Sequence, residues 1–338
     1  MPVEVSAFQS ALLAWYEAHA RALPWRERPA EPYRVWLSEV MLQQTTVAAA
    51  IPYFERFTAR WPTVGSLAAA DDADVMQAWA GLGYYARARN LLACARVVTA
   101  LGGFPRSEAE LRALPGIGAY TAAAVASIAF GGAAVVVDGN IERVMARLFG
   151  VTTPLPAARP ELRAHAAALT PHHRPGDHAQ ALMDLGATIC TPRSPRCDAC
   201  PVAVWCAGRA SGDPARLPLR LAKPARPVRH GTAFWLTVGG DVLLVRRPPR
   251  GLLGGMLALP TTEWTTMPIH PLVPVAADWQ PVPGEVRHVF SHFELHLTVA
   301  VAALTSRPLI TGEWWPRERI GEAGLPTVFA RAAALAAA

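Results

Sequence analysis

The first two thirds of the chain carry a helical pattern of apolar and polar positions. Apolar residues recur at three- and four-residue spacings, which predicts a series of amphipathic helices. Residue pairs that contain Pro or Gly, such as Leu23-Pro24 and Gly102-Gly103, interrupt the pattern and mark turns. The predicted helices are Phe8–His19, Tyr33–Arg60, Asp72–Gly81, Tyr85–Leu101, Glu108–Ala113, Thr121–Ala129 and Ile141–Phe149.

The last third of the chain has the composition of short β-strands. Residues 234–237, 242–245 and 295–301 form runs rich in β-branched and aromatic residues, and we predict a strand at each. Gly239-Gly240-Asp241 lies between the first two runs and predicts a hairpin turn. The alanine-rich end, residues 332–338, predicts a helix. We therefore predict that the last third of the chain forms a small α+β module.

The segment between these regions has the composition of a linker. Residues 211–230 hold four prolines among basic residues and few large apolar side chains, which predicts a basic, semi-stiff connection. A length of 338 residues also favours about two domains. We therefore predict a multidomain chain, all-α over residues 1–210 and α+β over residues 231–338.

The composition is that of a globular protein with a polyanionic partner. Hydrophobic residues make up 52% of the chain, and the net charge is +6. The longest apolar stretch, Ala122 to Val137, is broken by Gly131-Gly132 and is shorter than the ~20 residues that span a bilayer. The N-terminus has no secretory signal pattern. We expect a cytoplasmic protein without membrane contact.

Four cysteines, Cys190, Cys197, Cys200 and Cys206, lie close together with the spacing C-x6-C-x2-C-x5-C. Zinc ribbons usually contain two C-x2-C pairs, and this loop contains one. A loop that wraps a [4Fe–4S] cluster fits better, because each iron of the cluster needs a thiolate. The cluster is favoured, with zinc and disulfides as alternatives. Cys94 lies in a helical run and is predicted to be an ordinary core residue.

The segment 114–118, Leu-Pro-Gly-Ile-Gly, lies between two predicted helices. Gly116 and Gly118 would let a phosphate approach the backbone N–H groups at the start of the second helix, where the helix dipole also favours an anion. This helix–Gly-x-Gly–helix pattern indicates a sequence-independent grip on a DNA backbone. Alone, it is also compatible with a plain tight turn.

A candidate general acid, Glu39, lies in the predicted helix that begins at Tyr33. Its neighbours on the helix face are mainly apolar, and loss of solvation would raise the pKa of its carboxyl towards neutrality. The alternative is a solvated surface glutamate. The adjacent amides of Gln43 and Gln44 favour the catalytic interpretation, because they can replace the base pairing that a flipped nucleotide loses.

A second carboxylate, Asp138, ends an apolar run and is followed by Gly139 and Asn140. This position would place it at the mouth of a buried segment. The alternative is an N-cap of the helix Ile141–Phe149. The two interpretations are compatible, because Asn140 could take over the cap.

Together, Glu39, Asp138, the glycine hairpin and the cysteine loop resemble the helix-hairpin-helix DNA glycosylases of the endonuclease III superfamily. A glycosylase that also cleaves DNA as a lyase needs an amine to form a Schiff base. The resemblance places that amine two residues after the last glycine of the hairpin, where this chain has Tyr120. The only lysine is Lys223, in the predicted linker. We therefore expect a monofunctional glycosylase.

Within the superfamily, the chain resembles the adenine DNA glycosylase (MutY-type) family, which removes adenine mispaired with 8-oxoguanine. The hairpin and the cysteine loop take part in this resemblance, which covers essentially the whole chain. It implies a six-helix barrel over about residues 23–134 and a cluster lobe made of residues 1–22 and 135–210. The other matching segments are Leu23-Pro24-Trp25-Arg26, Leu37–Thr45, Gly81–Ala88 and Val137-Asp138-Gly139-Asn140.

The resemblance implies roles for single residues. Glu39 would protonate N7 of the flipped adenine, Asp138 would stabilise or trap the sugar cation, and Tyr120 would assist them. Tyr84 and Tyr85 in their glycine-flanked turn also suit base stacking, with core packing as the alternative. The implied adenine pocket is Trp25, Arg26 and Gln180, and the implied DNA and 8-oxoguanine contacts are Gln43, Gln44, Thr45, Leu82, Tyr84, Gly116 and Gly118.

The C-terminal module resembles the damage-sensing domain of the same family, which is related to the Nudix fold. Residues 247–255 are its most visible segment, but no glutamate-rich Nudix helix follows; Glu263 and Asp278 are the only acids in the next segment, 261–283. Without a carboxylate cluster for Mg²⁺, we expect no pyrophosphate hydrolysis. Phe290, Ser291 and His292 match the loop that would inspect 8-oxoguanine.

Two positions depart from the family pattern. Leu253 stands where a tryptophan is common, and Glu142 stands where some members have lysine. The expected cofactor is a [4Fe–4S] cluster, and the expected partner of this monomer is double-stranded DNA with A opposite 8-oxoguanine, in the nucleoid of a bacterial cytoplasm. The alternatives are an endonuclease III-like enzyme for damaged pyrimidines and a non-catalytic iron–sulfur DNA sensor.

Overall fold

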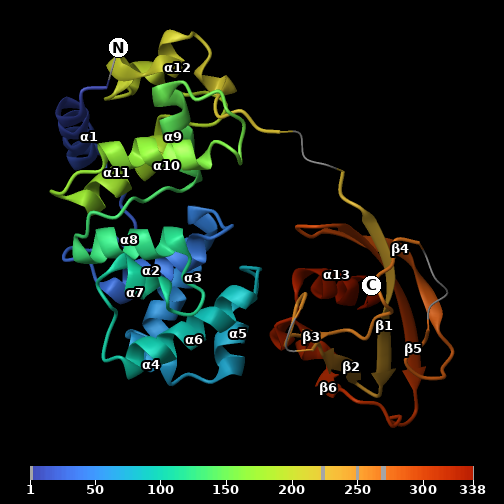
Figure 1. Cartoon of the computed structure of the whole chain (residues 1–338). Helices are drawn as coiled ribbons and strands as arrows, with labels where there is room; N and C mark the ends of the chain where they lie inside the picture. Colours follow the sequence, from blue (N-terminus) through green and yellow to red (C-terminus); the bar gives the residue numbers. More distant parts are fainter. Residues whose placement is uncertain (1–2, 222–224, 249–250, 268–271, 338) are drawn as a thin grey trace. The chain divides into compact units, whose positions relative to one another are not determined.

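The computed structural model describes residues 3–221, 225–248, 251–267 and 272–337. Its elements run from helices in the first part of the chain to strands in the last part (Figure 1). Backbone contacts group the chain into two units, residues 1–69 with 90–222 and residues 70–89 with 223–338. Among the described residues, no helix is long and apolar enough to cross a membrane.

The predicted helical character of the first part is confirmed, but one predicted helix is two, and the helices after residue 150 were not predicted one by one. Several helices begin just after a residue whose side chain accepts hydrogen bonds from free backbone N–H groups of the first turn, such as Glu4, Glu31 and Thr46. The helices are α1 Val5–His19, α2 Pro32–Leu42, α3 Val47–Arg60, α4 Val64–Ala68, α5 Asp72–Trp79, α6 Ala86–Ala100, α7 Glu108–Arg112, α8 Ala119–Phe130, α9 Gly139–Phe149, α10 Arg159–Leu169, α11 Pro175–Thr188 and α12 Ala207–Ala210.

The prediction of one continuous helix over residues 33–60 is wrong. Helix α2 ends at Leu42, and α3 starts after Thr46, whose side chain accepts a hydrogen bond from the Ala49 N–H. Gln44 in the turn has a φ of 59°, which a helix cannot accommodate. The tertiary fold thus places Gln43, Gln44 and Thr45 in a turn at the end of the Glu39 helix, where Gln44 is exposed and the other two are half-buried.

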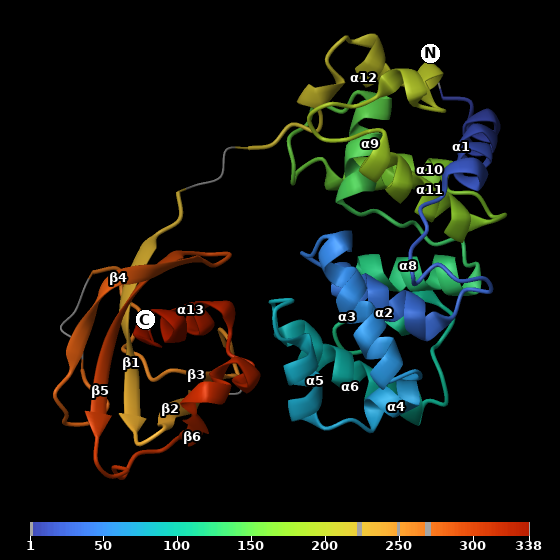
Figure 2. The same ribbon diagram turned by 180° about the vertical axis from the view of Figure 1, so that it is seen from behind.

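Helix α8 lies at the centre of the first unit. It packs against α2 and α7 on one side (α7 is labelled in Figure 1) and against α11 on the other, and Figure 2 shows α8 between α2 and α11 from behind. Residues 121–127 are all buried, and most are alanines, which allow close approach of neighbouring helices. Gly176 at the start of α11 is one such close approach, because a Cβ there would lie 2.6 Å from the Ser127 carbonyl oxygen.

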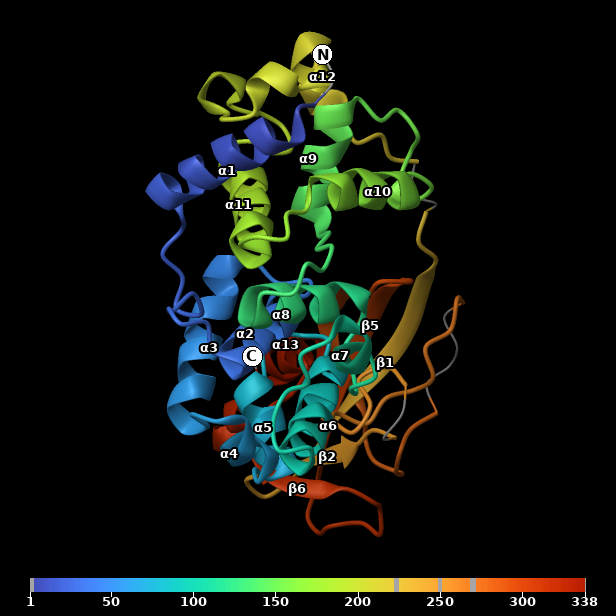
Figure 3. The same cartoon turned by 60° about the vertical axis from the view of Figure 1, so that its left-hand side comes forward.

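Four helices of the first unit share a hydrophobic core. Helices α1, α9, α10 and α11 surround it, and Figure 3 shows α9 and α11 beside the cysteine-bearing segment before α12. Apolar residues from α1, including Phe8 and Leu12, pack against residues from α9 and α11. The N-terminal helix therefore belongs to the same lobe as the cysteine loop.

The second unit contains the predicted α+β module. Its sheet has the order β3-β2-β1-β5-β4, with β6 paired to β2, and helix α13 (Thr327–Ala337) packs against β4, β5 and β1. Strands β1 and β5 are parallel, and the other pairs are antiparallel. The strands are β1 Val228–Val238, β2 Asp241–Arg246, β3 Leu257–Ala258, β4 Gln280–Val289, β5 Glu294–Leu304 and β6 Glu313–Pro316.

The three predicted strands and the hairpin turn are confirmed, whereas β4 was not predicted. This strand contains Pro281 and Pro283, which usually argue against a strand. It lies at the edge of the sheet, and its pairing with β5 shifts between Val282 and Val286. At an edge strand, the missing N–H of a proline removes no hydrogen bond between central strands. The connection before the sheet is shorter than the predicted linker 211–230, because Leu217 is buried and β1 begins at Val228.

Candidate active site

A cavity of about 770 Å³ opens in the first unit. Its walls come from the segment after α1, the end of α2 with its turn, the start of α8, the start of α9 and one face of α11. Because these elements lie far apart in the sequence, only the fold brings their polar residues together. Lining residues include Arg21, Trp25, Arg26, Glu39, Gln43, Gln44, Thr45, Tyr120, Asp138, Asn140 and Gln180.

The Glu39 carboxyl lies in this cavity and is only 5% exposed. The Tyr120 hydroxyl donates a hydrogen bond to its Oε2 atom over 2.6 Å. Burial raises the pKa of Glu39 to about 7; the hydrogen bond from Tyr120 opposes this rise, nearby Asp138 adds to it, and Arg26 opposes it. The carboxyl therefore holds a proton close to neutral pH, as a general acid requires.

Tyr120 is a neutral hydrogen-bond donor in this site. Burial and the nearby carboxylates of Glu39 and Asp138 raise the pKa of its hydroxyl well above the usual value. Its ring also belongs to the edge of the core around α9 and α11, which fixes its position. Tyr120 thus joins the start of α8 to the Glu39 carboxyl.

Asp138 is the N-cap of α9. Its Oδ1 atom accepts a hydrogen bond from the Ile141 N–H over 2.7 Å, and its Oδ2 atom accepts one from the Asn140 side-chain amide over 2.8 Å. The expectation that Asn140 could take over the cap is therefore wrong, because Asn140 instead donates to the capping carboxylate. Asp138 caps the helix and lines the cavity at the same time.

The three residues expected to form an adenine pocket all line the cavity. Trp25 is buried and packs edge-on against Phe54, with ring centres 5.3 Å apart. The Gln180 side chain donates to the Gly176 carbonyl oxygen over 3.3 Å. Arg26 is bound by Asp184 on α11. Sequence reasoning missed Asp184, although an acid inside the apolar stretch 181–186 was a usable signal.

The turn after α2 presents the residues expected to meet DNA. Gln43 is half-buried, and its amide donates to the Thr121 hydroxyl over 3.2 Å. Gln44 is exposed, with the left-handed φ of 59° that the turn imposes. The Thr45 side chain donates to the Gln43 carbonyl oxygen over 3.4 Å. All three side chains line the same cavity as Glu39.

The glycine hairpin lies between α7 and α8 as predicted. Gly116 has a φ of 72°, and a Cβ at this position would lie 2.5 Å from the Asn90 Cβ atom. Gly118 is the N-cap of α8, and nothing lies within 4 Å of the place where its Cβ would be. The first glycine is required by the backbone, and the second leaves open space at the start of a helix of 12 residues.

The glycine-rich turn before α6 separates its two tyrosines. Tyr84 is 53% exposed with a φ of 49°, whereas Tyr85 is buried and its hydroxyl accepts a hydrogen bond from the Gly81 N–H. Leu82 in the same turn is buried. Of the two tyrosines, Tyr84 has the ring that is available for stacking on a base, and Tyr85 is a packing residue.

The four cysteines of the loop line one small pocket. All four are half-buried free thiols. Burial raises the pKa of Cys200 to about 11 and also raises the pKa of Cys206, so a metal centre would have to displace their protons. The described residues contain no group of three or more His, Cys, Asp or Glu side chains in the arrangement of a single-ion site.

Arg147 supplies a positive charge beside these sulfurs. Its side chain is fully buried, and it donates to the Cys190 Sγ atom over 3.2 Å. Its other partners among the described residues are backbone carbonyl oxygens, those of Cys190, Thr191, Pro192 and Leu217. A buried arginine that binds carbonyls and a sulfur suits an anionic thiolate centre, because such a centre offsets its charge.

Arg143 connects the cysteine loop to the start of α9. Its Nε atom donates to the Cys190 carbonyl oxygen over 2.7 Å, and its Nη2 atom donates to the Asn140 side-chain oxygen over 2.9 Å. Asn140 in turn donates to Asp138. Sequence reasoning missed both Arg143 and Arg147, because α9 shows them only as ordinary arginines at helical spacing.

Three family models match the chain. The HhH-GPD superfamily of base excision DNA repair proteins matches residues 37–168. The iron–sulfur binding domain of endonuclease III matches residues 190–206, and the NUDIX domain matches residues 232–335. The three matches thus fall on part of the cavity lining, on the cysteine loop and on the sheet domain.

The human adenine DNA glycosylase is 36% identical, and the alignment covers 96% of this chain and 73% of the human one. The chain belongs to the adenine DNA glycosylase family. The Mycolicibacterium smegmatis adenine DNA glycosylase is 43% identical over 60% of this chain and 70% of its own. As a family member, the chain is a DNA-binding hydrolase of N-glycosyl bonds in base excision repair.

Solved structures share the helical fold. A thermostable thymine-DNA glycosylase is 31% identical, with a TM-score of 0.56, over 61% of this chain and 96% of its own. Endonuclease III in a non-covalent complex with DNA is 23% identical, with a TM-score of 0.53, over 63% of this chain and 99% of its own. The similarity to endonuclease III shows a shared fold and nothing more.

The iron–sulfur match identifies the centre that the cysteine loop of this glycosylase holds. Cys190, Cys197, Cys200 and Cys206 are the thiolate ligands available for a [4Fe–4S] cluster. The buried Arg147 supports this fit. Bound to these four thiolates, the cluster would cross-link the loop, on which Arg193 and Arg196 are exposed.

The sheet domain of this family member carries the loop predicted to inspect the damaged base. Phe290 stacks on Trp264, with ring centres 5.8 Å apart, while Ser291 and His292 are exposed between β4 and β5. In the segment 247–255, Leu253 has a φ of 55°, and Pro249 and Arg250 lie outside the described residues. The second departure from the family pattern, Glu142, forms an ion pair with Arg159.

Proposed function

We propose that this enzyme removes adenine mispaired with 8-oxoguanine or guanine, without a lyase step. The adenine nucleotide is flipped out of the duplex into the cavity, its N-glycosyl bond is broken, and water adds to the sugar to leave an abasic site. The observation that carries the proposal is the buried Glu39 carboxyl, whose pKa is near 7, in one cavity with Tyr120 and Asp138.

Glu39 is the general acid in this scheme. An adenine leaves more easily when its N7 is protonated, and a carboxyl that keeps its proton near neutral pH can supply that proton. The hydrogen bond from Tyr120 holds the carboxyl in one orientation and stabilises the carboxylate after the proton has left. Tyr120 therefore assists the acid without itself ionising.

Asp138 acts on the sugar. Departure of the base leaves an oxocarbenium-like cation, which an ionised carboxylate stabilises by charge or traps covalently. The Ile141 N–H and the Asn140 amide both donate to Asp138 and keep it oriented. Glu39, which supplies a proton to the base, and Asp138, which acts on the sugar, thus have complementary tasks in one cavity.

Residues around the cavity hold the base and the duplex. Trp25, Arg26 and Gln180 form the adenine pocket. The exposed turn with Gln44 enters the duplex where the adenine has left, and Gln43 and Thr45 contact the DNA beside it. The backbone N–H groups near Gly116 and Gly118 bind a phosphate at the start of α8.

The residue types argue against lysine-dependent lyase chemistry. Tyr120 takes the place that a lyase gives to lysine, and Tyr120 already donates to Glu39. Lys223 is the only lysine of the chain and lies outside the described residues. Borohydride should therefore trap no efficient covalent adduct with DNA, and an efficient adduct would favour the endonuclease III-like alternative.

Recognition of 8-oxoguanine is assigned to the sheet domain, residues 231–338, and to the turn with Leu82 and Tyr84. Phe290 presents an aromatic ring, and Ser291 and His292 offer hydrogen-bonding groups. The enzyme works as a monomer in the cytoplasm at the nucleoid. Deleting residues 231–338 should mainly reduce the preference for 8-oxoguanine over guanine, and an unchanged preference would refute this assignment.

The direct test uses a duplex with A opposite 8-oxoguanine. Glu39→Gln should abolish adenine release in single-turnover assays and should retain DNA binding, because glutamine keeps the shape of the side chain but has no acidic proton. Release at nearly the wild-type rate would disprove the acid assignment. A parallel duplex with thymine glycol should remain uncut, with or without alkali.

A further inference from the structure

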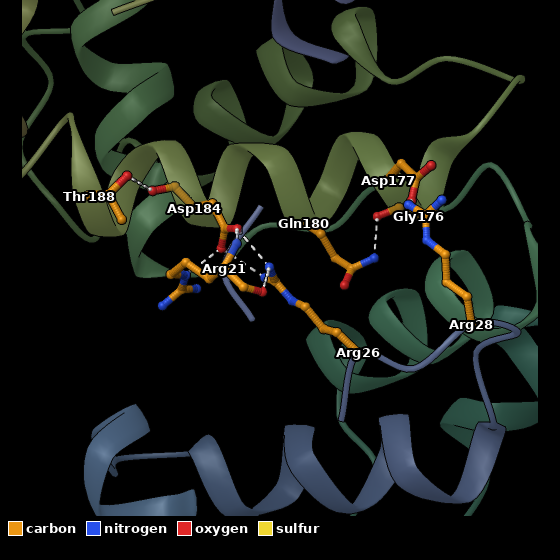
Figure 4. A network of polar contacts seen from close by, with 8 residues as sticks. All are labelled: Arg21, Arg26, Arg28, Gly176, Asp177, Gln180, Asp184 and Thr188. Atoms are coloured by element: carbon orange, nitrogen blue, oxygen red, sulfur yellow. Dashed lines mark hydrogen bonds and ion pairs between the residues drawn. The ribbon is translucent and has the colours of Figure 1, made fainter. Parts of the chain in front are cut away.

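One face of helix α11 holds the chain segment 21–28, which carries part of the adenine pocket. Asp177, Gln180 and Asp184 follow one another at three- and four-residue spacings and therefore share a helix face. Figure 4 shows the two acids of this face bound to arginines of the facing segment, with Gln180 between them. Asp177 binds Arg28 near the surface, whereas Asp184 is fully buried.

Four hydrogen-bond donors surround the Asp184 carboxylate. Its Oδ1 atom accepts from Arg26 Nη2 over 2.8 Å and from Arg21 Nε over 2.6 Å. Its Oδ2 atom accepts from Arg26 Nη1 over 2.6 Å and from the Arg21 backbone N–H over 3.0 Å. Burial would raise the pKa of Asp184, but the hydrogen bonds and charges of the arginines outweigh it and lower the pKa. A bidentate pair of this kind fixes the guanidinium in one orientation.

The Arg26 guanidinium held in this way faces the reaction site. Arg26 lines both the main cavity and a smaller cavity of about 260 Å³ next to it. Its charge lowers the pKa of Glu39, against the larger effect of burial. The Tyr16 ring lies on another side of the guanidinium, 5.9 Å from its centre.

The polar and charged groups around Glu39 come from four elements. Tyr120 on α8 donates to it, Asp138 at the start of α9 repels its carboxylate form, and Arg26 attracts that form. The arginine is not alone, because Asp184 on α11 binds it and offsets its charge. If Asp184 were neutral, two half-buried arginines, Arg21 and Arg26, would line the cavity without this acid to offset their charge, and Glu39 would ionise more easily.

We propose that Asp184 is a positioning residue of the active site, which holds Arg26 against α11 and offsets its charge so that Glu39 keeps its proton at neutral pH. Asp184 itself touches no reacting atom in this scheme. The inference rests on the proposed role of Glu39 as general acid. It also explains why a carboxylate is buried beside the adenine pocket.

The test compares the pH dependence of single-turnover adenine release, from about pH 5 to 9, in the wild type and in Asp184→Asn. Release falls as the pH rises through the pKa of the acid. Loss of the Asp184 charge favours the carboxylate form of Glu39, so the basic limb of the profile should move to lower pH by about half a unit or more. A basic limb at the wild-type position would overturn the inference.

Two further variants separate charge from damage to the fold. Arg26→Gln leaves Asp184 bound to Arg21, so its basic limb should move the opposite way, to higher pH. The basic limb of the double variant, Arg26→Gln with Asp184→Asn, should lie between the basic limbs of the two single variants. If Asp184→Asn does not fold, as judged by circular dichroism, Arg26→Gln still decides the question, because an unmoved or lowered limb contradicts the charge balance.

Asp177→Asn is the matched control. It removes an acid from the same helix face that also binds an arginine of the segment 21–28, but Asp177 lines only the smaller cavity. Its basic limb should stay at the wild-type position. A shift as large as that of Asp184→Asn would mean that any acid on this face acts equally, which contradicts a specific role for Asp184.

A second readout does not depend on activity. The Glu39 carboxyl can be titrated by NMR in protein with ¹³C-labelled glutamate, and Glu39→Gln identifies its signal. Asp184→Asn should lower the midpoint of this titration. If the wild type released no adenine, the proposed function would fail, but the titration would still test the inference; if it released adenine and the midpoint did not move, only the inference would fail.

Discussion

The hydroxyl of Tyr120 lies 2.6 Å from the Oε2 atom of Glu39, although 81 residues separate the two in the sequence. This hydrogen bond joins the start of α8 to α2 inside the cavity. It opposes the effect of burial on the Glu39 carboxyl, whose pKa nevertheless stays near 7. The pair therefore sets the proton affinity of the candidate acid, and it can be altered with one substitution.

Tyr120→Phe should raise the pKa of Glu39 further, because the lost hydrogen bond favours the carboxylate form. The basic limb of the pH profile of adenine release should then move to higher pH. The rate below that limb should fall by about tenfold, since the carboxylate left after proton transfer loses a hydrogen bond worth about 1–2 kcal/mol. A limb that moves to lower pH would contradict this assignment.

The Glu39 carboxyl should make the protein less stable at alkaline pH. Its pKa is about 7 in the folded protein against 4.5 ordinarily, so its proton stabilises the fold below about pH 4.5, and this contribution is lost as the pH rises through 7. Glu39→Gln should therefore raise the free energy of unfolding by about 2–3 kcal/mol at about pH 8.

Urea unfolding of the wild type and Glu39→Gln at several pH values measures this difference. The two proteins should have nearly equal stability at about pH 4.5, where both side chains are mostly neutral. A difference that stays constant across the pH range would show that the substitution acts by packing and not by charge.

Gly116→Ala should destabilise the hairpin. The position has a φ of 72°, and a Cβ would lie 2.5 Å from the Asn90 Cβ atom, so we expect a loss of about 1–3 kcal/mol in thermal or urea unfolding. Gly118→Ala is the control, since its φ of −86° is ordinary and its Cβ has open space. The control should keep most of the stability, and equal losses in both variants would argue against the backbone explanation.

Arg147→Leu should reduce the iron content of the purified protein. It removes the buried charge beside the Cys190 sulfur and leaves several carbonyl oxygens of the loop without a donor. Iron per chain and the visible absorbance of the cluster measure the effect. Arg193→Leu, an exposed change in the same loop, should keep its iron and weaken DNA binding in a salt-dependent manner. Full iron content in Arg147→Leu would show that Arg147 does not stabilise the cluster.

Much of the site could be predicted because single residue types carry the chemistry. Glu39, Asp138 and the four cysteines stand in short local patterns whose spacing reports their tasks. The hairpin glycines could also be found, because a φ of 72° at Gly116 is a local backbone requirement. Local patterns failed at the turn after α2, where Thr46 caps a new helix although the apolar spacing continues through it.

The sequence by itself determined the helical character of the first part, the α+β character of the last part and which residues can ionise, bind a metal or turn sharply, because these properties depend on residue type and on neighbours along the chain. Tertiary structure decided what surrounds each group. The pairing of Arg26 with Asp184 joins residues 158 positions apart, and the burial that raises the pKa of Glu39 comes from packing between distant helices. Desolvation and charge act through space, so only the fold sets the proton affinity of the site.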